Sequence, residues 1–149
     1  MDNTVPDPLF VCVDHVGLAV PDLDEAIRMH TEVLGWRVLH RETNEEQGVE
    51  EAMLGTGEQG AESAQIQLLA PLRPDSAIGK FLDRSGPGLQ QMAYRVKDID
   101  AVSAVLRERG TRLLYDEPRR GTAGSRINFV HPKDANGVLL EIVEPGRGH

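Results

Sequence analysis

His15-Val-Gly-Leu-Ala-Val-Pro-Asp-Leu-Asp24 and Gln91-Met-Ala-Tyr-Arg-Val-Lys-Asp-Ile-Asp100 are two stretches of one chain that share a pattern of apolar and acidic residues. Four positions match at a separation of 76 residues: Val20 with Val96, Asp22 with Asp98, Leu23 with Ile99, and Asp24 with Asp100. Two later blocks repeat in the same order, Gly35–Val38 over Gly110–Leu113 and Gln67–Pro71 over Glu141–Pro145. Two copies are too few for a solenoid, so the repeat predicts two modules that pair into one closed unit.

Each copy has the same predicted order of secondary structure: a strand, an Asp-rich turn that can cap a helix, a helix that ends at a glycine, and three further strands. In the first copy these elements are expected over Cys12–Ala19, Leu23–Leu34, Trp36–Arg41, Glu50–Leu54 and Gln65–Leu69. In the second they are expected over Leu89–Val96, Ile99–Arg109, Arg112–Tyr115, Arg126–Val130 and Val138–Val143. The prediction is an α+β fold of one domain, residues 1–149. It comprises two tandem βαβββ modules, about 10–70 and 89–145, and a linker over about 71–88 with a short helix at Ile78–Leu82.

Size and composition narrow the class of protein. A chain of 149 residues is long enough for one domain with a sizeable core. The formal net charge of −8 argues against a nucleic-acid partner, and no apolar run approaches the roughly 20 residues of a membrane span. The single cysteine, Cys12, fits a reducing compartment and reads as a small core residue between two valines. We therefore expect a soluble, cytoplasmic protein.

Modules that pair about a twofold axis would bring equivalent positions together. The first strands offer His15 and Gln91, and the last strands offer Gln67 and Glu141. Taken singly, each is best read as a hydrogen-bonded strand residue. Four polar residues at equivalent positions favour a common site, because an imidazole, a carboxylate and two amide oxygens suit an octahedral metal with two positions open.

Asp14-His-Val-Gly-Leu-Ala-Val20 resembles the opening of the vicinal-oxygen-chelate superfamily. Several later stretches are similar, more narrowly, to bacterial methylmalonyl-CoA epimerases: Asn44–Val49, Leu114–Gly121, Gly124–Phe129, His131–Lys133 and Gly137–Leu139. The resemblance runs from about Phe10 to Glu144. It implies the glyoxalase/bleomycin-resistance-like fold and epimerisation of (2R)- and (2S)-methylmalonyl-CoA.

The resemblance also implies which residues bind a divalent metal ion. It places the ligands on His15, Gln67, Gln91 and Glu141. Members of the family usually have Gly-Leu-His-His where this chain has Gly88-Leu-Gln-Gln91. An amide oxygen in place of an imidazole nitrogen favours harder ions, so Mn²⁺, Mg²⁺ or Co²⁺ is expected in preference to Zn²⁺.

Epimerisation requires a proton to leave C2 on one face and to return on the other, which two bases can achieve. A bound cation would stabilise the enolate that forms between these steps. The resemblance places one base on Glu51, whereas composition alone does not choose between Glu51 and its neighbour Glu50, which strand alternation turns to opposite faces. Glu141 is the second candidate, in addition to its role as a ligand.

The expected partners are an acyl-CoA substrate and, by resemblance, a second copy of the chain. The substrate phosphates would need positive charge, for which Arg119, Arg120 and Arg126 are candidates; a merely solvated basic loop is an equal reading. His40 is expected to be a surface or packing residue. Two other functions remain open on this fold: a glyoxalase-like isomerase, and a metal-independent protein that binds a small molecule such as an antibiotic.

Overall fold

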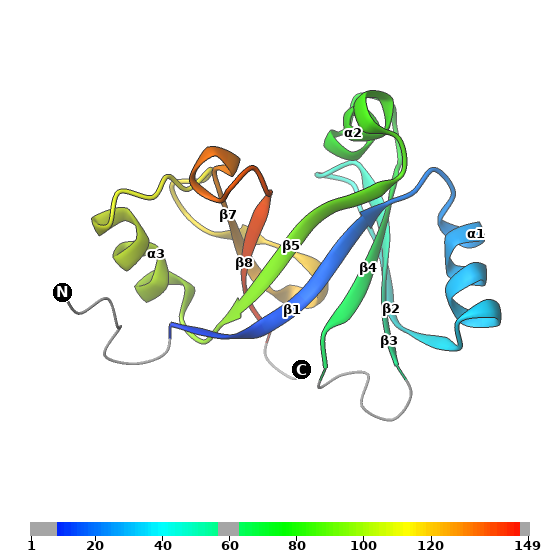
Figure 1. Cartoon of the computed structure of the whole chain (residues 1–149), viewed down its shortest axis with the longest axis horizontal. Coiled ribbons are helices and arrows are strands. Elements are labelled where there is room, and N and C mark those ends of the chain that lie inside the picture. Colours follow the sequence, from blue (N-terminus) through cyan, green and yellow to red (C-terminus); the bar gives the residue numbers. More distant parts are fainter. Residues whose placement is uncertain (1–8, 57–62, 147–149) are drawn as a thin grey trace. The chain divides into compact units, whose positions relative to one another are not determined.

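The computed structural model describes residues 9–56 and 63–146. It contains two compact units, shown in Figure 1. One unit is His15–Gln91, and the other joins Met1–Asp14 to Met92–His149. The chain passes between the two units twice, between Asp14 and His15 and between Gln91 and Met92.

The His15–Gln91 unit is built on four strands in the order β2-β3-β4-β1. Their bounds are β1 Phe10–Ala19, β2 Trp36–Asn44, β3 Val49–Thr56 and β4 Gln65–Pro71. Strand β3 runs antiparallel to both β2 and β4, whereas β1 runs parallel to β4. All four predicted strands are present and extend slightly beyond the predicted limits.

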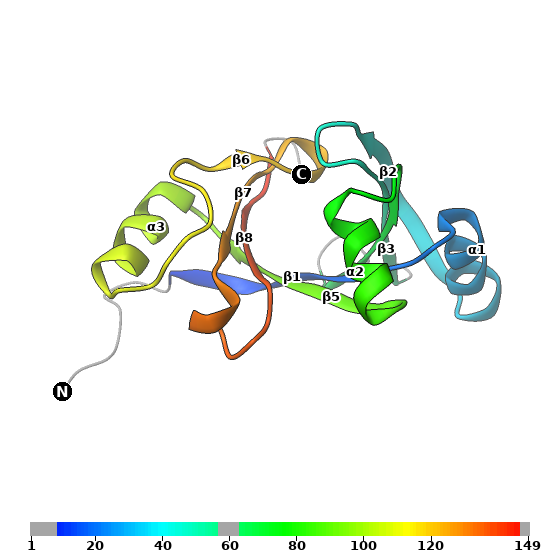
Figure 2. The same ribbon diagram turned by 90° about the horizontal axis from the view of Figure 1, so that it is seen from above.

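Two helices lie on opposite faces of these strands (Figures 1 and 2). Helix α1, Leu23–Arg28, begins at the cap residue Asp22 and buries Leu23 against Leu54 and Leu68. Helix α2, Ala77–Ser85, packs Ile78 on the other face of the strands. The predicted helix Leu23–Leu34 is thus an α-helix followed by a π-helical turn, η1, over Met29–Val33. In that turn the imidazole of His30 lies 2.9 Å from the carbonyl oxygen of Ala26.

The second unit has the strand order β5-β8-β7-β6. Its elements are β5 Gly88–Val96, α3 Ile99–Glu108, β6 Arg119–Arg120, the 3₁₀ turns η2 Thr122–Gly124 and η3 Pro132–Asp134, β7 Arg126–Val130 and β8 Leu140–Glu144. The first residues of β5, up to Gln91, belong to the other unit. Helix α3 begins at Asp98 and buries Ile99 and Val102 against Val130 and Ile142.

Two sequence predictions about this unit and β1 are wrong. Arg112–Tyr115 is not a strand; only Leu113 forms a bridge, with Val130. At Tyr115 the backbone pairs with the buried side chain of Asn128, which accepts from the N–H of Tyr115 and donates to its carbonyl oxygen. Cys12 is exposed rather than part of the core.

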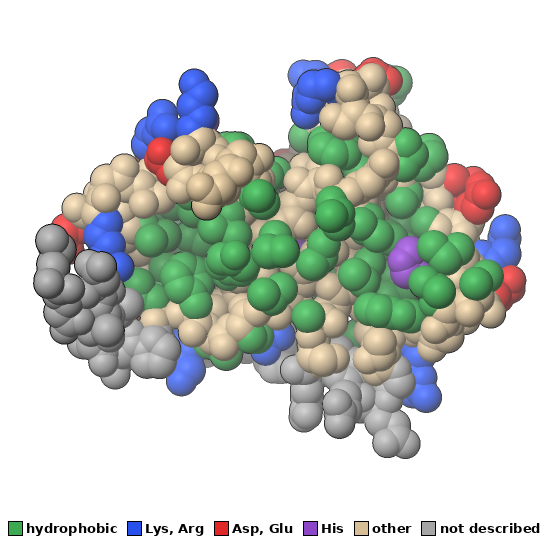
Figure 3. Space-filling view, viewed as in Figure 1, with side chains coloured by type: hydrophobic (Ala, Val, Ile, Leu, Met, Phe, Trp, Pro, Cys, Tyr) green, Lys and Arg blue, Asp and Glu red, His purple; other side chains and the backbone are tan. Residues whose placement is uncertain are grey.

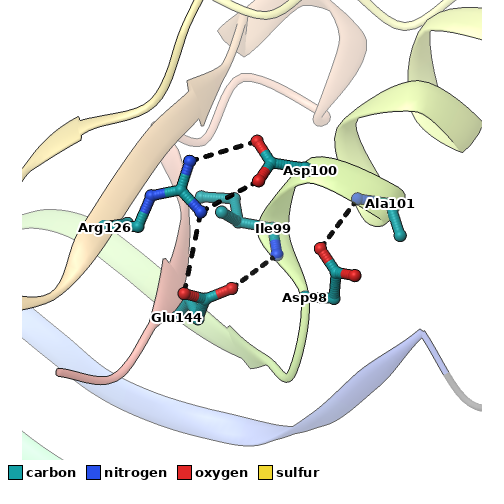
Figure 4. Close-up of polar contacts among 6 residues, drawn as sticks. All are labelled: Asp98, Ile99, Asp100, Ala101, Arg126 and Glu144. Carbon is teal, nitrogen blue, oxygen red and sulfur yellow. Dashed lines mark hydrogen bonds and ion pairs between the residues drawn. The ribbon is translucent and has the colours of Figure 1, made fainter. Parts of the chain in front are cut away.

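A charged contact joins the first turn of α3 to β7 and β8 (Figure 4). The guanidinium of Arg126 donates to both carboxylate oxygens of Asp100, at 3.0 and 3.1 Å, and lies 3.8 Å from Glu144. Glu144 also accepts from the free backbone N–H of Ile99 at 3.0 Å. Because Asp100 and Glu144 lie near a helix N-terminus, they also interact favourably with its dipole.

The exposed surface of the first unit includes apolar side chains. Figure 3 shows hydrophobic side chains over the region of α1, and Met29, Val33 and Leu34 are exposed there.

Among the described residues, no helix has the length and apolar character needed to cross a membrane.

Candidate functional site

One face of the β1, β3 and β4 strands carries buried polar residues. His15 on β1, Glu51 on β3 and Gln67 on β4 are each at most 5% exposed. Glu51 is paired in register with Leu69, which packs against α2, so these residues lie on the face opposite α1. We call this surface the polar face.

Four side chains on the polar face form a chain of contacts. Gln91 on β5 donates through Nε2 to Oε1 of Gln67 at 3.0 Å, and Gln67 donates through Nε2 to Oε2 of Glu51 at 3.0 Å. The same Nε2 of Gln91 lies 3.4 Å from Nε2 of His15. We name His15, Glu51, Gln67 and Gln91 the polar cluster. The structure therefore brings together four of the five residues that the sequence predicts for the site.

Gly17 makes this arrangement possible. A Cβ atom at position 17 would lie 2.6 Å from Cγ of Gln91 and 3.3 Å from a methyl group of Leu69. Any side chain at position 17 would push Gln91 away from Gln67. The glycine of the His-x-Gly opening thus has a steric role in the cluster.

The structure distinguishes the two adjacent glutamates and the two adjacent glutamines. Glu51 is buried and bonded to Gln67, whereas Glu50 is paired with Ala70 on the opposite face and is more exposed. Gln91 joins the cluster, whereas Oε1 of Gln90 is buried without a hydrogen-bond partner among the residues described. Sequence alternation predicts that neighbours face opposite sides. Burial identifies Glu51 as the member of its pair in the cluster, and the hydrogen bond to Gln67 identifies Gln91.

Glu141 lies in the other unit, on β8. It is buried and is paired in register with Ala93 of β5 and Phe129 of β7. Its predicted roles as ligand and base stay predictions.

The three candidate arginines have different environments. Arg126 is engaged by Asp100, whose hydrogen bond raises the pKa of the guanidinium and lowers the pKa of the carboxyl group. Arg119 places its guanidinium carbon 3.8 Å from the ring centroid of Tyr115, a cation–π contact. Arg120 is exposed on β6. Arg126 is therefore a structural contact, and only Arg119 and Arg120 remain as candidates for binding phosphate.

The polar cluster offers a hard divalent cation one imidazole nitrogen and two amide oxygens as donors. Among the described residues, no three His, Cys, Asp or Glu side chains gather to hold a metal ion, so a cation bound here would depend on the amide oxygens of Gln67 and Gln91.

Sequence reasoning missed one polar pair on the same unit. His40 and Glu42 on β2 are in contact, with Nε2 of His40 lying 2.8 Å from Oε1 of Glu42. A His-x-Glu pair in a strand has both side chains on one face, which is a signal that the sequence does contain.

The chain matches known proteins over nearly its whole length. Residues 14–129 match the model of the Glyoxalase/Bleomycin resistance protein/Dioxygenase superfamily. A methylmalonyl-CoA epimerase from Mycobacterium tuberculosis is 53% identical, with a TM-score of 0.88 over 97% of this chain and 94% of that one. A Streptomyces coelicolor methylmalonyl-CoA epimerase variant in complex with 2-nitronate-propionyl-CoA is 47% identical, with a TM-score of 0.84 over 91% and 98%.

A curated relative gives the same result from sequence alone. The ethylmalonyl-CoA/methylmalonyl-CoA epimerase of Cereibacter sphaeroides is 35% identical over 87% of this chain and 95% of its own length. Both the fold and the sequence therefore place this chain in the glyoxalase/bleomycin-resistance superfamily, as a member of the methylmalonyl-CoA epimerase family.

Proposed function

We propose that this protein interconverts (2R)- and (2S)-methylmalonyl-CoA by removing the proton from C2 and returning one to the opposite face. The observation that carries the proposal is the buried carboxylate of Glu51, hydrogen-bonded to Gln67 at the end of the polar cluster. A structural neighbour that is an epimerase was solved with an acyl-CoA analogue. The similarity to this epimerase supports the same substrate class for this chain.

Glu51 would act as one of the two bases. The hydrogen bond from Gln67 fixes the orientation of the carboxylate, which general-base catalysis requires. Burial on the polar face excludes most water, so that the proton is transferred between Glu51 and the substrate. We propose Glu141 as the second base, on the opposite side of C2.

His15, Gln67, Gln91 and Glu141 would hold a divalent metal ion. Such an ion supplies Lewis-acid stabilisation of negative charge on the substrate oxygens. One imidazole, one carboxylate and two amides form a set of mainly oxygen donors, which supports Mn²⁺, Mg²⁺ or Co²⁺ over Zn²⁺. Gln67 would then have two roles, because its amide oxygen serves the ion while its amide nitrogen holds Glu51.

Arg119 and Arg120 are our candidates for contacting the phosphates of coenzyme A. Both are exposed on β6, and their charges are not engaged by the Asp100 carboxylate that holds Arg126. Association into a homodimer, which the resemblance implies, is a further proposal. Sedimentation at several protein concentrations would test it.

The proposed function is tested by hydrogen exchange at C2 of methylmalonyl-CoA in deuterated water. Metal-stripped protein is reloaded with Mn²⁺, Co²⁺, Mg²⁺ or Zn²⁺, and each sample is compared with a control without enzyme. We expect metal-dependent exchange accompanied by inversion at C2. No exchange above the control with any metal would contradict the epimerase and favour a protein that only binds a small molecule. Turnover of a hemithioacetal without C2 exchange would favour a glyoxalase-like isomerase.

A further inference from the structure

The edge strand β2 contains a β-bulge that changes the face on which its side chains lie. Before the bulge, Val38 is paired with Leu54, a core residue under α1. After it, His40 is paired with Met53 and Glu42 with Glu51. In a regular strand Val38, His40 and Glu42 would share one face. The extra residue in the bulge places His40 and Glu42 on the polar face instead.

The resulting pair of Glu42 and Glu51 is not explained by folding. Residues directly opposite in an antiparallel pair have Cβ atoms about 4.5–5.5 Å apart, and like charges there destabilise a sheet. The contact of 2.8 Å between His40 and Glu42 adds a group that can carry positive charge. Bulges near active sites commonly redirect a side chain for function.

The exposed fraction increases from Glu51 to Glu42 and from Glu42 to His40. Glu51 is 5% exposed, whereas the side chains of Glu42 and His40 are 25% and 39% exposed. The series therefore leads from a buried carboxylate to an imidazole that reaches solvent. An imidazole exchanges protons readily near neutral pH.

Epimerisation with two bases creates a need for such a route. After each turnover, the base that took the proton from C2 is protonated and the opposite base is not. Another turnover in the same direction requires Glu51 to lose its proton to solvent, from which its burial separates it.

We propose that Glu42 and His40 form a proton relay between Glu51 and solvent; this inference rests on the proposed function. Protonated Glu51 gives its proton to the carboxylate of Glu42, which becomes neutral as Glu51 regains its charge. Glu42 then passes the proton to neutral His40, and the resulting imidazolium releases it to water. The same steps in reverse protonate Glu51 when it must deliver a proton to C2.

The test follows the label in methylmalonyl-CoA deuterated at C2, incubated with the metal-loaded protein in ordinary water. In the native protein, Glu51 should exchange its deuteron with solvent before returning it, so recovered substrate loses label while product forms. His40→Gln keeps an amide that can donate to Glu42 but cannot carry a proton. We expect recovered substrate to retain its label, with kcat at least about ten-fold lower and KM unchanged. The full loss of a positioned proton transfer, typically about 10²–10⁴-fold, sets the upper limit of the effect.

Chemical rescue separates a relay from a structural role. Adding imidazole at constant pH and ionic strength should restore both kcat and loss of label in His40→Gln, and Glu42→Gln should show the same retention of label. The matched control is Arg41→Gln, since Arg41 lies between His40 and Glu42 on the strand and pairs with Asp24 at 2.9 Å. This variant should lose label and turn over as the native protein does, and added imidazole should not change its kcat.

Two outcomes are distinguishable. The relay is wrong, and the proposed function stands, if the native protein turns over but His40→Gln and Glu42→Gln lose label as it does. The same holds if His40→Gln loses activity without rescue by imidazole. If the native protein shows no exchange at C2 with any metal, the proposed function itself fails.

Discussion

Glu51 is the residue on which the proposed chemistry depends most. Replacing its carboxylate by the amide in Glu51→Gln preserves size and a hydrogen bond to Gln67, but it removes the base. We expect C2 exchange to fall by about 10²–10⁴-fold or below detection. Metal content, measured by elemental analysis, and the unfolding midpoint should stay near those of the native protein. Equal activity in the variant would remove Glu51 from the mechanism.

Gln91 offers a test of metal preference at a single residue. Gln91→His restores the imidazole that the family usually has, in a position where Gly17 leaves room for the side chain. An imidazole nitrogen is a softer ligand than an amide oxygen, so we expect affinity for Zn²⁺ and Co²⁺ to rise by on the order of ten-fold. That change corresponds to about 1.4 kcal/mol of binding free energy. Affinity for Mg²⁺ should not rise. Competition with a chromophoric chelator would measure both, and unchanged Zn²⁺ affinity would exclude position 91 from the metal site.

A buried side chain holds Tyr115, next to the backbone bridge that Leu113 forms with Val130. Asn128 is fully buried, accepts from the N–H groups of Tyr115 and Phe129, and donates to the carbonyl oxygen of Tyr115. Asn128→Ala leaves these groups without their partner, which costs about 1–3 kcal/mol for each one that stays buried. We expect the free energy of unfolding, measured in urea, to fall by at least about 2 kcal/mol. Lys80→Ala, at an exposed position of α2, is the control and should change it little.

The ion pair between Arg112 and Asp134, in the turn before β8, should make the stability of the folded protein depend on pH in acid. Arg112 donates to both oxygens of Asp134, at 2.9 and 3.0 Å, and holds the pKa of that carboxyl well below its usual value near 3.9. A lowered folded-state pKa means that the contact contributes stability above pH 3.9 and loses it as the pH falls further. Asp134→Asn should therefore flatten the fall in stability below about pH 4. Acid titrations followed by circular dichroism would show this, and superimposable curves for the two proteins would contradict it.

Local sequence signals account for most of the elements, and the exceptions have physical causes. Each Asp-rich turn caps its helix as expected, and the structure selects Asp22 over Asp24 and Asp98 over Asp100 as the cap residues. The strand expected at Arg112–Tyr115 is reduced to one bridge at Leu113, and at Tyr115 the side chain of Asn128 takes the backbone hydrogen bonds. The bulge in β2 has no glycine or proline to mark it, so the face of His40 is known only from the pairing with β3.

At the scale of the whole molecule, the internal repeat predicts the site better than any motif considered alone. It selects His15, Gln67, Gln91 and Glu141. The structure brings the first three into contact, although 76 residues separate His15 from Gln91. The internal repeat does not select Glu51, and the preference for Glu51 over Glu50 came from the family resemblance. Burial and the hydrogen bond to Gln67 agree with that choice.

Global stability gives a test of the metal site that does not depend on activity. An ion that binds the folded protein but not the unfolded chain adds about 2.7 kcal/mol at a hundred times its Kd. For a chain of this size we expect the unfolding temperature of the metal-stripped protein to rise by roughly 5–10 °C with Mn²⁺ at that concentration. Gln67→Ala should lose most of this rise, because it removes a ligand, whereas Gln90→Ala should keep it, because Gln90 lies outside the polar cluster. Equal shifts in both variants would mean that the ion binds elsewhere on this acidic protein.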